Sequence, residues 1–549
     1  SFKNYSSSST ERSASYNHYY MSSYDPSSME YKITRIGDEQ STALTNDGSR
    51  NGDRKMYFQA ILDYNRIFKE VHDLNIMFLY NQEQYDINGP TTLFSSLPQR
   101  KQGVAGRVSY SYDGRYYIEG NFGYNGSENF AKGHRFGFFP SIAVGYNISN
   151  EKFWQPIKPV ISNLKIRGSW GLVGNDATNA GRFAYMEDLV LGGSDSYTTG
   201  IRQDTYYSGP SWNRYFNPDL TWEVGEKINL GLDLQLFNDF NLTFDIFREK
   251  RRDIFMTREN SIPEIVGTGE TKITSNNGEM ENKGLDLAID YNKQITKDFF
   301  LSFKSTLTFA RNKVLKMDES PYFEYPGLSD VGHPLGTYWG YVADGLFPDQ
   351  ETIDNSPRQD LGYTPQPGDI KYVNQPNAKG EYDNVINSND RVAIGHPYDP
   401  ELVYGFGPSM KWKNWDFSFF FQGVARTSFM MYGMHPFGTT SIKNMLQFVA
   451  DDHWSVDNPN PNAAYPRLTK DSNGNNDQYS TYWLRNAAFL KLKNAEIGYT
   501  YKGMRFYLSG VNLLTFSPFK HWDPEMGGGN GLYYPTQRVF NIGFQMTIQ

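Results

Sequence analysis

Several aromatic side chains lie where they could bind a ligand. Tyrosine and tryptophan rings stack on sugar rings and on peptide side chains, and their polar atoms add hydrogen bonds. Six of them lie in long polar connections or at the edges of such connections, and packing within the connection is the alternative role for each. These candidate ligand-binding residues are Trp212, Tyr215, Trp339, Tyr341, Trp454 and Trp483.

Carboxylates offer a second kind of chemistry, in the Asp- and Asn-rich segment 367–391. A calcium ion binds several oxygen atoms around a sharp turn that requires glycine, and Gly380 fits that need. The regular spacing of a calcium loop is missing, so turns stabilised by Asx hydrogen bonds are the alternative. A structural calcium ion held by Asp369, Asp383 and Asp390 is therefore the one metal site that the sequence suggests, and no other cofactor is expected.

Catalytic constellations do not emerge from the sequence. The histidines are scattered, neither HExxH nor GxSxG occurs, and the adjacent Asp451 and Asp452 are expected to be solvated. Cysteine is absent, which excludes disulfides, thiolate metal sites and a cysteine nucleophile. The net charge of −8, without a basic stripe, argues against a nucleic-acid partner. We therefore predict that the chain is not an enzyme.

The elements that position these residues are predicted to be strands. Apolar and polar residues alternate in segments 228–236, 285–291, 402–412 and 540–548. A period of two is typical of strands with one apolar face. The mean hydropathy is −0.63, and no apolar run reaches the roughly 18 residues of a transmembrane helix. A membrane barrel remains compatible, because its strands have one apolar and one polar face.

The connections alternate between short and long along the chain. Asp113 and Gly114 form the clearest short turn, because both residues tolerate the positive φ of a tight hairpin. Short connections are predicted at 24–28, 68–73, 113–114, 150–163, 238–239, 293–297, 413–415 and 502–504. Long ones are predicted at 37–53, 85–101, 125–134, 174–220, 257–277, 316–401, 432–486 and 517–537. This alternation is typical of outer-membrane barrels, with short periplasmic turns and long extracellular loops.

Two strands for each short turn, together with a final strand at 538–549, predict about seventeen strands. Because bacterial barrels usually have an even number, the sequence is expected to begin in mid-barrel, with Ser1 in an extracellular loop. The polar run 6–9 fits that exposed loop, and the asparagine-rich tract 472–477 is predicted to be a loop tip. The basic tract 250–252 lies where a strand leaves the membrane; solvation is expected, and contact with anionic lipopolysaccharide is the alternative.

From about residue 99 to the end, short phrases appear in the order found in a known family. The chain resembles the SusC-like TonB-dependent transporters of Bacteroidota outer membranes. The similar phrases include LKIRGSWGLVGN (164–175), NPDLTWEVGEKINLGLDLQLF (217–237), GEMENKGLDLAIDY (278–291), HPLGTYWGYVADGLF (333–347), PGDIKY (367–372), NDRVAIG (389–395), AAFLKLKNAEIGYT (487–500) and NLLTFSPFKHWDPE (512–525).

The resemblance implies an all-β fold, a transmembrane antiparallel up-and-down β-barrel. About 17 of the 22 strands of such a barrel would be present, and the plug domain would not be in this sequence. Residues 1–549 would form the C-terminal part of this one barrel. Its long extracellular loops, at about 174–220, 316–401 and 432–486, would contact the ligand and a lid.

The function implied by the resemblance is active import of an oligomeric nutrient through the cell outer membrane, a glycan ahead of a peptide. Implied partners are a SusD-like surface lipoprotein, TonB with ExbB and ExbD, and outer-membrane lipid with lipopolysaccharide. Whether two such SusCD-type pairs form a dimer is left open by the resemblance. Two alternatives remain: a passive porin, or a surface adhesin or assembly component that uses the barrel as an anchor.

Overall fold

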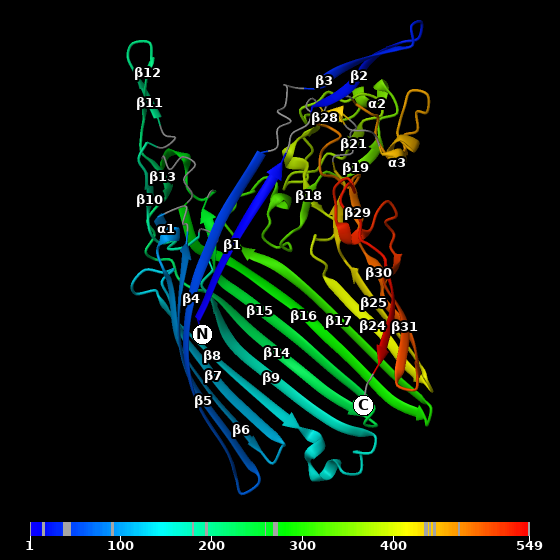
Figure 1. Ribbon diagram of the computed structural model, residues 1–549. Coiled ribbons are helices and arrows are strands. Elements are labelled where there is room, and N and C mark those ends of the chain that lie inside the picture. Colours follow the sequence, from blue (N-terminus) through cyan, green and yellow to red (C-terminus); the bar gives the residue numbers. More distant parts are fainter. Residues whose placement is uncertain are drawn as a thin grey trace.

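The computed structural model describes residues 2–13, 17–36, 45–88, 93–177, 181–192, 196–258, 260–266, 273–432, 437–438, 441–442, 446–469 and 473–546. Within these residues, one sheet of 16 strands dominates the fold, and neighbouring strands in it are antiparallel (Figure 1). Its strands, in their order across the sheet, are β1 (Phe2–Ser13), β4 (Thr45–Phe68), β5 (His72–Asn88), β6 (Gln99–Tyr112), β7 (Tyr116–Ser127), β8 (Phe136–Asn147), β9 (Ile161–Asn175), β14 (Glu223–Leu236), β15 (Phe240–Arg258), β16 (Ile273–Thr296), β17 (Phe299–Lys316), β24 (Leu402–Trp412), β25 (Trp415–Ala425), β30 (Phe489–Tyr501), β31 (Met504–Phe516) and β32 (Val539–Met546).

The short turns predicted from the sequence join neighbouring strands of this sheet in all but one case. Asp113 and Gly114 have φ values of 49° and 60°, and Arg115 donates its backbone N–H to the Tyr112 carbonyl at 2.9 Å. Two successive positive φ values match the twist of a two-residue hairpin. The short turns lie at one end of the sheet and most of the irregular structure lies at the other (Figure 1).

Two predictions about the first part of the chain were wrong. The turn at 24–28 joins β2 (His18–Asp25) to β3 (Glu30–Ile36), which form a separate hairpin between β1 and β4. The run 6–9, expected in an extracellular loop, lies in β1 and pairs with β4. The main sheet therefore has 16 strands among the described residues, against the predicted seventeen or so. Ser1 itself lies outside those residues.

The two faces of the sheet differ as the alternation predicted. On β14, Ile228 and Leu230 are exposed on the same face as Ile246 of β15, to which Leu230 is paired. The opposite face has Asp233 and Asp245, which both contact Arg167 of β9. So much exposed apolar surface is stable only against lipid, so we name this the outer face and the polar one the inner face.

The connections contain eight two-stranded sheets and three short α-helices among the described residues. No described helix has both the length and the apolar character needed to cross a bilayer. The sheets pair β2 with β3, β10 (Asp188–Val190) with β13 (Ser211–Arg214), β11 (Ser196–Thr199) with β12 (Thr205–Ser208), β18 (Tyr338–Gly340) with β23 (Val392–Ile394), β19 (Ala343–Leu346) with β21 (Ile370–Tyr372), β20 (Arg358–Gln359) with β22 (Val385–Ile386), β26 (Ser428–Met430) with β29 (Leu484–Asn486), and β27 (Phe437–Gly438) with β28 (Ser441–Ile442); the helices are α1 (Leu93–Ser96), α2 (Gln350–Asp354) and α3 (Gln447–Asp451).

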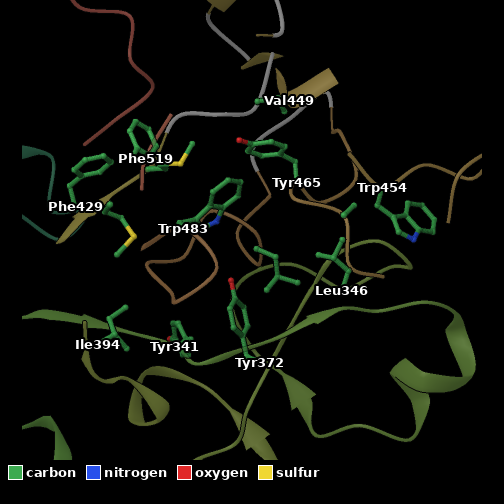
Figure 2. Packing of buried hydrophobic residues seen from close by; sticks show 14 of the residues in the cluster. Tyr341, Leu346, Tyr372, Ile394, Phe429, Val449, Trp454, Tyr465, Trp483 and Phe519 are labelled. Atoms are coloured by element: carbon green, nitrogen blue, oxygen red, sulfur yellow. The ribbon is translucent and has the colours of Figure 1, made fainter. Parts of the chain in front are cut away.

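The largest cluster of buried apolar side chains lies in these connections and not in the main sheet. Barrel strands have no packed apolar interior, because their apolar face meets lipid. The long connections can bury apolar area only against one another, and Figure 2 shows their side chains gathered there. We call this cluster the loop core: Tyr341, Leu346, Ile370, Tyr372, Ile386, Ile394, Phe429, Met430, Met431, Val449, Trp454, Ala463, Tyr465, Trp483, Ala487 and Phe519.

Candidate functional site

A cavity of about 290 Å³ opens into the loop core. Tyr432 and Tyr479 are the most exposed aromatic residues around it, at 51% and 47%. Sites for small molecules typically combine apolar walls with a few polar groups, and this lining does so. The lining residues are Met431, Tyr432, Val449, Tyr465, Pro466, Arg467, Leu468, Thr469, Asn473, Asn476, Asp477, Gln478, Tyr479 and Trp483.

A buried ion pair supports one side of the cavity. The Arg467 Nε donates to Asp369 Oδ1 at 2.7 Å, and Arg467 Nη2 donates to the Tyr363 hydroxyl at 2.7 Å. The Asp369 side chain is fully buried, and its second oxygen accepts the Gln366 backbone N–H at 2.8 Å. Burial strengthens such an ion pair only if the remaining hydrogen bonds are made, as they are here. The pair therefore holds Arg467 in one orientation beside the cavity.

Gly368 allows the chain to approach the core closely at this point. Its φ of 88° favours glycine, and a Cβ there would clash with the Trp454 ring. The Gly368 backbone donates to the Phe347 carbonyl at 2.7 Å and accepts from the Arg467 backbone at 2.9 Å. The phrase PGDIKY thus presents Asp369 to Arg467 from a turn that only glycine fits.

The asparagine-rich tract was expected to be a loop tip, and this prediction was wrong for its described residues, 473–477. Asn473, Asn475 and Asn476 are 2%, 0% and 4% exposed. Asn473 and Asn476 each donate a side-chain N–H to Asp369 Oδ1, at 3.0 and 2.9 Å. Asn475 donates to the Ile370 carbonyl at 2.9 Å. Short amides can be buried because each supplies both a donor and an acceptor to the backbone around it.

The tyrosines around the cavity act as neutral hydrogen-bonding groups. A hydrogen bond with Tyr533 raises the pKa of Tyr432, and burial raises the pKa of Tyr465. Both shifts keep the hydroxyl protonated well above neutral pH. Near neutral pH, the Tyr432 and Tyr465 rings are therefore uncharged surfaces with a hydroxyl at one end.

The six aromatic candidates lie in different surroundings. Tyr341, Trp454 and Trp483 are buried in the loop core, as the packing alternative predicted, although Trp483 also lines the cavity. Trp212 and Tyr215 stack on each other with ring centroids 5.4 Å apart in the connection between β9 and β14. The sixth, Trp339, donates its Nε1 to Asp330 Oδ1 at 2.6 Å and meets His333 edge-on. Packing contacts therefore account for most of these rings, and ligand contact by any of them stays a prediction.

The three predicted calcium ligands have other partners. Asp369 belongs to the ion pair with Arg467. Asp390 accepts the backbone N–H groups of Gln375 and Asn387, at 2.7 and 2.8 Å, and Asp383 accepts that of Val385 at 3.0 Å. No group of three or more His, Asp or Glu side chains is arranged around a metal position in the described residues. These carboxylates fit Asx-type turns better than a shared ion, and calcium stays a prediction without geometric support.

Residues that the sequence reasoning missed include Tyr432, Tyr479, Arg467 and Asn473. Each lies in the predicted long loop 432–486, but nothing in their spacing separates them from other polar residues of that loop. Two sequence signals did point to the neighbourhood: the asparagine-rich tract and the phrase PGDIKY. The sequence does not show that these two segments are in contact, because they are about a hundred residues apart.

The comparison with protein families decides the identity of the sheet. The family described as TonB dependent receptor-like, beta-barrel, matches residues 1–513. The chain belongs to this family. The receptor-barrel fold, the SusC-like resemblance and the location in the cell outer membrane are thereby confirmed. Its relatives are receptors and transporters, which also confirms the prediction of a barrel that is not an enzyme.

The proteins similar to this chain include TonB-dependent receptors of two Bacteroidota genera and a peptide transporter of known structure. The chain is 27% identical over 478 residues to the TonB-dependent receptor P3 of Formosa agariphila, and the match covers 81% of this chain and 45% of that protein. It is 29% identical over 468 residues to the TonB-dependent receptor SusC of Bacteroides thetaiotaomicron, and the match covers 80% of this chain and 43% of SusC. The RagAB peptide transporter has the same fold, with a TM-score of 0.70 and 21% identity, covering 91% of this chain and 56% of the other. This receptor barrel therefore spans about half the length of the curated relatives that it matches.

The inner face of this receptor barrel has ion pairs that join neighbouring strands. Arg505 of β31 contacts Asp416 of β25, and it contacts Glu496 of β30 at 2.5 Å. Arg167 contacts Asp233 at 3.2 Å and Asp245 at 2.6 Å across β9, β14 and β15. These pairs keep the inner face polar and hydrated.

Proposed function

We propose that this chain is the barrel of an importer that moves an oligomeric nutrient through the outer membrane with energy supplied by TonB. A glycan is the preferred substrate class and a peptide the second. The observation behind the proposal is the loop-core cavity, where the exposed rings of Tyr432 and Tyr479 lie beside Asp477, Gln478 and other polar side chains. Sugar rings stack on such aromatic surfaces while their hydroxyl groups bond to amides and carboxylates.

The similarity to known importers supports this proposal. SusC and the Formosa relative are TonB-dependent receptors by name, and RagAB, which shares the fold, is a peptide transporter. Beyond the cavity, the polar inner face with its paired charges offers a hydrated surface along which a polar oligomer could move.

The uptake of oligosaccharide tests this role of the cavity. Replacing Tyr432 and Tyr479 together with alanine should slow uptake about thirtyfold at subsaturating substrate, because each lost ring removes roughly 1 kcal/mol of contact. The measurement is uptake of labelled oligosaccharides and peptides by cells that express the full-length variant. Tyr197→Ala with Tyr207→Ala is the matched control, because these stacked tyrosines of β11 and β12 are also exposed. Equal uptake by both double variants would show that the cavity has no role in transport.

Partners of the proposed importer are a SusD-like surface lipoprotein at the loop end and TonB with ExbB and ExbD on the periplasmic side. The similarity to SusC supports this set. After mild detergent extraction of the native outer membrane and size-exclusion chromatography, mass spectrometry should find a lipoprotein that co-elutes with the receptor. The apparent mass should show whether two such pairs assemble. A receptor that elutes without any lipoprotein would overturn the partner proposal.

Two other functions, a passive porin and the anchor of a surface adhesin, are distinguished from the importer by further tests. A passive porin would conduct ions steadily in a planar bilayer, whereas an importer with a closed lumen should be nearly silent. A barrel that serves only as the anchor of a surface adhesin would leave nutrient uptake unchanged on deletion and impair attachment of the cells. Loss of uptake without loss of attachment is the result expected here.

A further inference from the structure

Three positively charged residues lie side by side on the outer face of β15, β16 and β17. Arg248 is paired with Lys283, and Lys283 is paired with Arg311. Adjacent strands are about 4.8 Å apart, so the three residues lie within about 10 Å of one another. Like charges directly opposite each other destabilise a sheet, so they require anions nearby.

The chain itself supplies few of these anions. The Glu281 carboxylate contacts both Arg248, at 2.6 Å, and Lys283, at 2.7 Å. The Arg311 guanidinium contacts Glu401 at 3.1 Å, a carboxylate that also accepts from a further arginine. One carboxylate therefore serves two cations at each place, while the side chains of Arg248, Lys283 and Arg311 stay more than half exposed.

The next residues along the same face add to the positive charge. Lys250 contacts Glu279 at 3.0 Å, and Lys313 lies opposite Glu281 with no carboxylate partner of its own in the described residues. The five cations Arg248, Lys250, Lys283, Arg311 and Lys313 form what we call the basic patch. The carboxylates around them are those of Glu226, Glu279, Glu281 and Glu401, and because Glu401 is shared with Arg426, these four carboxylates face six cations, an excess of two positive charges.

The basic patch directly borders the apolar surface that faces lipid. Ile246, Leu285 and Phe309 form the adjacent row of the outer face, toward the short turns. The patch lies toward the other end, where the longer connection leaves β15 for β16. On β5 and β6, Tyr80 and Val104 are a pair on the outer face, and the next pair on that face toward the long loops is Gln82 with Gln102. Further along the same face, Arg100 of β6 and Arg54 of β4 each contact a carboxylate, Glu128 at 3.8 Å and Asp86 at 3.1 Å, so the shared carboxylates of β15–β17 are the difference.

We propose that the basic patch binds the phosphate groups of an anionic glycolipid in the outer leaflet of the membrane. Continuity with the lipid-facing surface places it at the level of lipid headgroups, where cations are attracted to anionic lipid. Arginine matches phosphate with two parallel hydrogen bonds, and lysine adds point charge. Of tract 250–252, Lys250 belongs to the patch, whereas Arg251 contacts Glu249 and Glu223 on the inner face and takes no part. This inference is independent of the proposed transport function.

The test measures lipid phosphate retained by the full-length receptor. The receptor is purified from the outer membrane in a neutral detergent, and phosphate-bearing glycolipid per protein is measured by mass spectrometry. In a variant with Arg248→Gln, Lys283→Gln and Arg311→Gln, retention should fall about tenfold. The matched control is Lys293→Gln with Lys297→Gln and Lys304→Gln, which removes the same charge from the short-turn end of the same hairpin. The control variant should retain lipid as the wild type does.

A second measurement covers the case in which the triple variant folds poorly. Wild-type receptor in phosphatidylcholine nanodiscs should unfold at a higher temperature when bisphosphorylated lipid A is added, and dephosphorylated lipid A should have no effect. Inorganic phosphate added to the detergent-solubilised receptor should not reproduce the shift, because the patch is expected to need an anchored headgroup. Equal retention by both triple variants, or equal shifts with both lipids, would overturn the proposal.

Discussion

Replacing Asp369 with alanine is expected to destabilise the loop core by about 3–5 kcal/mol, because it leaves a buried guanidinium without its carboxylate. Asp369 is fully buried and accepts from Arg467, Asn473 and Asn476. The substitution removes the acceptor that holds three donors, so the segments around 369, 467 and 473–477 should separate together. The result should be a loop core that opens locally while the main sheet stays folded.

Hydrogen exchange followed by mass spectrometry measures this effect directly. Amides in segments 359–373 and 473–487 should exchange at least a hundredfold faster in Asp369→Ala, since about 1.4 kcal/mol corresponds to tenfold. Asp383→Ala is the matched control, because within the described part of the chain its carboxylate accepts a single hydrogen bond, from the Val385 backbone N–H at 3.0 Å. Adding Arg467→Met to Asp369→Leu should restore part of the protection by removing both charges. Exchange in Asp369→Ala no faster than in Asp383→Ala would contradict the assigned role of the ion pair.

The second large effect is expected at Lys491, a fully buried lysine on β30. Its Nζ contacts Asp523 at 2.7 Å and Glu525 at 2.5 Å, and both carboxylates belong to the connection 517–538 between β31 and β32. The Asp523 side chain also accepts the Glu525 backbone N–H at 3.0 Å at the start of a short 3₁₀ helix (Pro524–Met526). This buried ammonium group therefore helps to attach the connection to the barrel.

Substitution Lys491→Met should release the connection, because two partly buried carboxylates would lose their shared cation. The local cost is expected to be about 3 kcal/mol, and limited proteolysis should then cut within 520–537. Lys493→Met is the control: this lysine contacts Glu525 at 3.2 Å, is more exposed, and should change cleavage little. Restoring protection by Asp523→Asn with Glu525→Gln in the Lys491→Met background would show that unpaired charge is the cause. A Lys491→Met connection as resistant as wild type would refute the attachment.

The strands of this receptor barrel were predictable because their signal is local. In 228–236 and 285–291 every second residue is apolar, and a strand places alternate side chains on opposite faces whatever the rest of the chain does. The Asp113–Gly114 hairpin is local in the same way, because two residues that tolerate positive φ are enough to define it. The turn at 24–28 is equally local, but its sequence does not say which sheet the hairpin joins. The two strands of that hairpin lie outside the main sheet and the unpredicted β1 lies in it, which accounts for the change from seventeen to the observed 16.

The candidate site depends on contacts between segments that are distant in the sequence. Asn473 and Asn476 are polar and were expected in solvent, yet Asp369 compensates their burial from about a hundred residues away. Arg248, Lys283 and Arg311 become neighbours only through the register of three strands. Amino-acid type and spacing thus determined the strands, the faces and the family. Only the tertiary structure decided which polar groups are buried together, because burial of charge depends on partners that no local pattern specifies.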